Sequence, residues 1–195
     1  MTIVIGIGNE LRRDDGAGPA AVAALRGRVA ALLPVALAVT DGEPARLIEL
    51  WAGADLAIVV DAVRAEPPAP GRIHDLGADT AALAARPVSG HALGLGEAVA
   101  LGLAVDRMPA RLRVLAIEGL DFGFGPGLTP QVSAAVGLVT DRLAAELAPP
   151  AVTDPPGGYG GGHASGRIAD KEHPMPHLEP LSLPASHRRR GGRPS

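Results

Sequence analysis

The chain has 195 residues, of which 47% are hydrophobic, 20% charged and only 2% aromatic, with a formal net charge of −3. This apolar content predicts a globular domain with an aliphatic core rather than a disordered chain. The absence of cysteine excludes disulfides, thiol nucleophiles and thiolate metal sites. No apolar run reaches the roughly 18–20 residues of a membrane-spanning helix. No basic leader precedes the first strand-like segment, so we expect a cytoplasmic protein.

Short strand-like runs alternate with helical patterns over residues 1–148, which is typical of an α/β domain. Strands are predicted at 2–7, 35–40, 55–63, 71–77 and 111–120. Helices are predicted at 17–33, 43–51, 91–105 and 129–147. The continuous apolar runs are expected of central parallel strands, whereas the more polar segment 71–77 is expected at an edge of the sheet.

Apolar residues at helical spacing predict the face that each long helix buries. These residues are Val22, Leu25, Val29 and Leu32 in the first helix, Leu95, Val99 and Leu103 in the third, and Val132, Val136, Val139, Leu143 and Leu147 in the last. Thr129 is placed to cap the last helix, with Pro130 at its first position.

The composition changes near Ala148. Glycine and proline dominate stretches such as "PPGGYGGGH", and the chain ends in "HRRRGGRPS". Such a segment cannot bury enough apolar surface to order itself, so residues 149–195 are predicted to be a disordered tail. The tail holds four of the six histidines, but their spacing matches no compact metal-ligand pattern. Because the preceding domain carries an excess of acidic residues, nucleic acid is not expected as a partner.

The stretch "GIGNELRRDDGAG" follows the first strand and resembles a nucleotide-binding turn. Gly6 and Gly8 fit the Gly-x-Gly-x-x-Gly pattern, but Leu11 occupies the third glycine position. Asp14 and Asp15 would also repel a pyrophosphate. A dinucleotide site is therefore a weak alternative.

Other polar residues gather where predicted strands end. Asp15, Asp41 and Asp61 follow or end three strands, and His91 precedes the third long helix. Because function collects at the carboxyl ends of strands in open α/β sheets, these side chains are candidates to converge. Two carboxylates and an imidazole suit nickel or zinc, with coordination positions left open. Each residue also has an ordinary structural interpretation: Asp15 at a helix N-terminus, Asp61 as a loop hydrogen bonder, and His91 as a structural residue.

Five segments together resemble the hydrogenase maturation protease family, the endopeptidases that trim nickel–iron hydrogenase large subunits. The matching segments are "GIGNELRRDDGAG", "DGEPARLIEL", "VVDAV", "SGHALGL" and "GLTPQV". The resemblance covers residues 2–147 in order. It implies a three-layer α/β/α fold, phosphorylase/hydrolase-like, with a twisted, mostly parallel but mixed five-stranded sheet.

The resemblance also implies the site and its substrate. Asp15, Asp61 and His91 would contact nickel, and Asp41 matches a position associated with cleavage or substrate handling. Gly6, Gly8 and Asn9 would shape the turn that presents Asp15. The nickel would arrive already bound to the large-subunit precursor and serve as the recognition signal before a C-terminal peptide is removed.

Two chemical routes are open at this stage: the metal positions or polarises the scissile peptide or a water, or an aspartate acts as general base and nickel is only a docking signal. A non-proteolytic metal-binding chaperone on the same scaffold is the alternative function. A monomer meeting a larger partner is expected. The glycine-rich segment 119–130, which carries both phenylalanines, has two interpretations: a simple connecting loop, or a mobile loop near the site that touches the substrate peptide.

Overall fold

The computed structural model describes residues 1–29, 35–77 and 92–148. Within them, five strands form one sheet in the order β2-β1-β3-β5-β4. The strands are β1 (Thr2–Ile7), β2 (Val35–Thr40), β3 (Leu56–Val63), β4 (Ile73–Leu76) and β5 (Leu112–Glu118). Neighbouring strands pair in parallel except β4, which is antiparallel to β5 and lies at the edge. This confirms the predicted mixed sheet and the edge position of 71–77.

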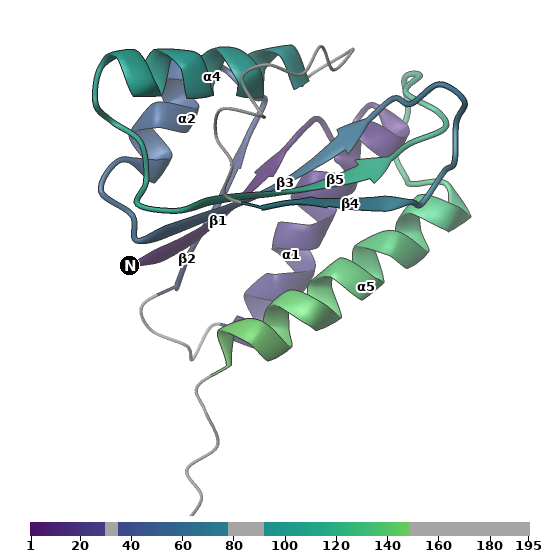
Figure 1. Cartoon of the computed structure of the whole chain (residues 1–195). Helices are drawn as coiled ribbons and strands as arrows, with labels where there is room; N and C mark the ends of the chain where they lie inside the picture. The colour runs from purple at the N-terminus through teal and green to yellow at the C-terminus, as the bar shows by residue number, and fades with distance from the viewer. Residues whose placement is uncertain (30–34, 78–91, 149–195) are drawn as a thin grey trace, which may run out of the picture. The chain divides into compact units, whose positions relative to one another are not determined.

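Helices cover both faces of the sheet (Figure 1). The short 3-10 helix η1 (Arg13–Gly16) leads into α1 (Ala17–Val29), and α1 packs with α5 (Pro130–Leu147) on one face. The opposite face carries α2 (Pro44–Trp51) and α4 (Ala92–Ala104). The three-layer α/β/α architecture is thereby confirmed. No helix of the described part is long and apolar enough to cross a membrane.

Each face of the sheet has its own aliphatic core. Successive side chains of a strand point to opposite faces, so Val60 and Ala62 join the cluster under α1 and α5, whereas Val59 joins the cluster under α2 and α4. The largest fully buried side chain, Trp51, belongs to the second cluster. Burial on both faces explains why β1, β3 and β5 read as continuous apolar runs.

The predicted buried face of α5 is confirmed, since Val132, Val136, Val139 and Leu143 are all buried. The prediction for α4 is wrong at Leu103, which is 52% exposed. The buried stripe of α4 instead runs through Leu95, Ala98, Val99 and Gly102. Because α4 is apolar on nearly every side, its hydrophobic pattern does not distinguish one face from another. Leu32 and the predicted tail 149–195 lie outside the described residues.

Candidate active site

The loop after β1 is folded so that it presents Asp15. Gly8 has a φ of +134°, and a Cβ added there would lie 1.9 Å from the carbonyl oxygen of Asp15. Only glycine permits this approach. The next residue, Asn9, donates its backbone N–H to Oδ2 of Asp15 at 3.1 Å, and the Asp15 N–H donates to the Arg12 carbonyl at 3.1 Å. The predicted role of Gly8 and Asn9 in shaping this turn is confirmed.

Asp14, although adjacent to Asp15, is used to hold the structure together. Its fully buried carboxylate accepts bonds from the backbone N–H groups of Leu120 (2.9 Å), Asp121 (3.0 Å) and Thr129 (2.6 Å), and from the Thr129 hydroxyl (3.0 Å). Burial by itself would raise the pKa of Asp14, but these four bonds outweigh it and lower the pKa. Asp14 therefore clamps the loop between β5 and α5 onto the loop between β1 and α1.

Asp61 lies near the end of β3 and is only 1% exposed. Its Oδ1 accepts the Ala62 N–H at 2.8 Å, whereas its buried Oδ2 accepts no hydrogen bond from the described residues. Burial, and to a smaller extent the negative charge of Asp15, raise the pKa of Asp61 to about 7 against the opposing effect of the Ala62 bond. The two carboxylates are thus close enough to interact in a buried place.

Such a pair is stable only when it shares a proton or binds a cation, because two adjacent buried negative charges repel one another. Oxygen donors of this kind suit a borderline or hard divalent cation. The described residues contain no group of three His, Cys, Asp or Glu side chains that could hold a metal by themselves. The third predicted ligand, His91, lies outside the described residues.

The first turn of α4 lies close to this edge of the sheet. A Cβ added at Gly94 would lie 2.5 Å from the carbonyl oxygen of Gly42, in the turn between β2 and α2. The described start of α4 therefore packs against the carboxyl end of β2, one strand from β1 and its Asp15 loop.

Asp41 is placed differently from Asp15 and Asp61. It is exposed just after β2, and its Oδ1 accepts bonds from the Glu43 N–H (3.2 Å) and the Thr40 hydroxyl (3.4 Å). Strand β1 separates β2 from β3, so their ends lie about 10 Å apart. These bonds make Asp41 a turn former ahead of α2, where Glu43 caps the first helical N–H groups.

A fourth buried carboxylate at the same edge, that of Glu118, was not predicted. Glu118 ends β5, is 2% exposed, and accepts bonds from His74 Nε2 (2.6 Å) and the Ala69 N–H (2.7 Å). Burial opposes ionisation, but these bonds and Arg72 hold the pKa of Glu118 below its usual range. The sequence did indicate this residue, because Glu118 follows a run of apolar strand residues, as Asp61 does.

Comparison with known proteins identifies the fold and its family. The model of a family described as hydrogenase maturation protease matches residues 34–146. The chain belongs to the hydrogenase maturation protease family. It is a peptidase, in agreement with the activity that its relatives carry in their names.

The relatives match most of the described chain. The hydrogenase 2 maturation protease of Escherichia coli (strain K12) is 29% identical over 148 residues, which are 74% of this chain and 89% of that protein. The solved structure of a hydrogenase maturating endopeptidase of E. coli has a TM-score of 0.62 at 27% identity, covering 75% of this chain and 91% of its own. The solution structure of an endopeptidase from E. coli has a TM-score of 0.63 at 25% identity, covering 75% and 92%. The family explains why the pattern of five segments runs along the folded part of the chain.

Proposed function

We propose that this protease removes a C-terminal peptide from the nickel-loaded precursor of a nickel–iron hydrogenase large subunit, and that the bound nickel is its recognition signal. The observation that carries the proposal is the buried pair Asp15 and Asp61, in which Asp61 Oδ2 receives no hydrogen bond from the described residues. A site that holds two interacting buried carboxylates favours a cation, which the substrate would bring. The cysteine-free chain is compatible with a reaction in the cytoplasm.

In this proposal Asp15, Asp61 and His91 complete the coordination of the precursor's nickel. Asp15 is oriented by the Asn9 N–H, and Asp61 is oriented by the strand that carries it and by the Ala62 N–H. Preorganised carboxylates lose little conformational entropy when they meet the metal. Asp41, exposed at the neighbouring strand end, is proposed to handle the substrate polypeptide rather than the metal.

Two routes to hydrolysis are consistent with this arrangement. In the first, the metal positions or polarises the scissile peptide or a water molecule. In the second, an aspartate that does not bind the metal accepts a proton from the attacking water, and nickel only docks the substrate.

The decisive experiment incubates the protein with nickel-loaded and nickel-free precursor and measures the mass of the large subunit. We expect loss of a C-terminal peptide only in the loaded sample. Asp15→Asn, Asp61→Asn and His91→Ala should abolish cleavage, whereas Asp141→Asn, an exposed aspartate on α5, should cleave normally. Stable complex formation without cleavage would favour the metal-binding chaperone instead. Cleavage by all three site variants would refute the assignment of the site.

A further inference from the structure

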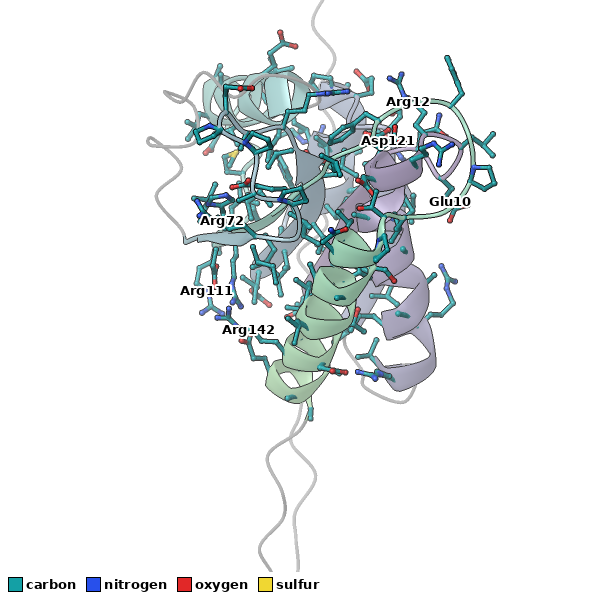
Figure 2. The ribbon with its side chains drawn as sticks, turned by 90° about the vertical axis from the view of Figure 1, so that its right-hand side faces the viewer. Glu10, Arg12, Arg72, Arg111, Asp121 and Arg142 are labelled. Atoms are coloured by element: carbon teal, nitrogen blue, oxygen red, sulfur yellow. The ribbon has the colours of Figure 1, made fainter. Side chains whose placement is uncertain are left out.

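The loop between β5 and α5 is fastened to the loop between β1 and η1 along its length. The Arg13 N–H donates to the Gly125 carbonyl (2.9 Å), and the Gly125 N–H donates to the Leu11 carbonyl (2.8 Å). Asp121 accepts the Asp14 N–H on its carbonyl (3.0 Å) and pairs through its side chain with Arg13 Nε (3.1 Å). Figure 2 shows Arg12 and Asp121 above the N-terminal end of α5. The segment expected to be a mobile loop is instead held by backbone hydrogen bonds and the Asp14 clamp.

Large apolar side chains of these two loops are exposed to solvent. Phe124 is 87% exposed, Leu11 is 67% exposed and Leu120 is 54% exposed. Leu11 and Phe124 are neighbours, because the residue after Phe124 bonds to the Leu11 carbonyl. An exposed aromatic side chain on an ordered loop contributes nothing to the core, and clusters of this kind mark interaction sites.

Two guanidinium groups lie over the two aromatic rings of the loop between β5 and α5, one over each ring. Arg12 lies 5.6 Å from the centre of the Phe124 ring and donates to the Phe122 carbonyl at 3.5 Å, while Arg64 lies 4.3 Å from the centre of the Phe122 ring. Stacking on aromatic rings holds both cations in place. None of the ion pairs among the described residues involves Arg12 or Arg64. We call Leu11, Arg12, Arg64 and Phe124 the aromatic–arginine surface.

This surface adjoins the candidate active site on two sides. The Arg12 carbonyl accepts the Asp15 N–H, and Arg64 follows Asp61 by three residues, just beyond the end of β3. A polypeptide whose metal centre meets Asp15 and Asp61 therefore passes beside this surface.

We propose that the aromatic–arginine surface docks the polypeptide segment of the precursor that borders the cleaved bond. An apolar side chain of that segment packs on Phe124 and Leu11, and a carboxylate, from Asp, Glu or the chain terminus, binds the guanidinium groups of Arg12 and Arg64. Guanidinium groups that have no carboxylate partner can bind a carboxylate with directed hydrogen bonds. Aromatic residues and arginines are also enriched in the hot spots of binding interfaces. This inference rests on the proposed function, because the occupant is the same precursor.

The test compares Phe124→Ser and Arg64→Glu with two matched controls. Leu138→Ser replaces an exposed leucine on α5 that is 64% exposed, and Arg26→Glu reverses an exposed arginine on α1. We expect each surface variant to raise KM for the nickel-loaded precursor by about tenfold while kcat at saturation stays unchanged, and both controls to match the wild type. The increase in KM caused by Arg64→Glu should be smaller at high salt, since salt screens interactions between exposed charges.

Precursor binding is measured in parallel on immobilised wild type and variants, without reference to cleavage. Wild-type KM in both surface variants would overturn the docking surface and leave the proposed function standing. Binding that is lost in the surface variants while the wild type never cleaves would support the docking surface and refute the proposed function. A dimer of the free wild type that Phe124→Ser dissociates, with unchanged precursor binding, would assign the surface to a second copy of this chain and overturn the proposal.

Discussion

Burial and, to a smaller extent, the negative charge of Asp15 raise the pKa of Asp61, although the two aspartates stand 46 positions apart in the chain. Both side chains are buried, Asp15 fully and Asp61 to 1% exposure. The two carboxylates repel one another when both are ionised. A proton removes this repulsion at low pH, and a bound cation would remove it at neutral pH. This pair is the feature from which the site's chemistry follows.

The raised pKa of Asp61 predicts how stability depends on pH. Because the folded protein binds this proton more tightly than the unfolded chain, its stabilising effect is full below pH 3.8 and is lost as pH rises to about 7. The free energy of unfolding should therefore fall by about 2–3 kcal/mol between pH 5 and pH 8 from this group. In urea titrations, the free energy of unfolding of Asp61→Asn should be nearly independent of pH over that range, with Asp41→Asn as the control. An equal slope in Asp61→Asn and wild type would contradict the burial assigned to Asp61.

Loss of the Asp14 clamp should destabilise the fold and open the loop between β5 and α5. Asp14→Ala leaves three buried backbone N–H groups and the Thr129 hydroxyl without their acceptor, so we expect a cost of about 2–4 kcal/mol in urea unfolding. Hydrogen exchange should accelerate at Leu120 and Thr129. Asp141→Ala on α5 is the control, and unchanged exchange at the two amides would refute the clamp.

Glycines of α1 make a matched pair for testing the close approach of the helix to the sheet. A Cβ at Gly18 would lie 2.3 Å from the Ile7 carbonyl oxygen and 2.5 Å from that of Val60, whereas one at Gly27 meets nothing within 4 Å. Gly18→Ala should therefore lower the melting temperature strongly, because backbone atoms of β1 and β3 would have to move. Gly27→Ala should raise stability by up to about 1 kcal/mol through helix propensity. Similar effects in both variants would show that the contact is not tight.

The Glu118–His74 pair should hold the connection between β3 and β4 in place. Glu118→Ala removes the acceptor of the His74 ring and of the Ala69 N–H, which should cost about 2–4 kcal/mol. Since the pKa of Glu118 is lowered in the folded protein, its contribution is present above pH 4.5 and lost as pH falls further. The difference in the free energy of unfolding between wild type and Glu118→Ala should accordingly become smaller at acidic pH. A difference that is constant down to pH 3 would argue against an ionised Glu118.

Most of the fold was predictable because it depends on local patterns. Continuous apolar runs marked β1, β3 and β5, and the stripe of Val132, Val136, Val139 and Leu143 marked the buried face of α5. In α4 the same method misplaced Leu103, because an apolar helix carries no contrast between its faces. A local pattern therefore identifies the buried face of a helix only where the opposite face is polar.

The sequence by itself determined which residues stand at the carboxyl ends of the strands, and therefore that Asp15 and Asp61 share one edge of the sheet. Only the tertiary structure decided the roles of two adjacent aspartates: Asp14 faces donors from the loop before α5, while Asp15 faces Asn9 and the charge of Asp61. The reason is physical. The donors that set the role of Asp14 come from residues more than a hundred positions away, and the buried charge beside Asp15 belongs to another strand. Neither composition nor spacing records these contacts.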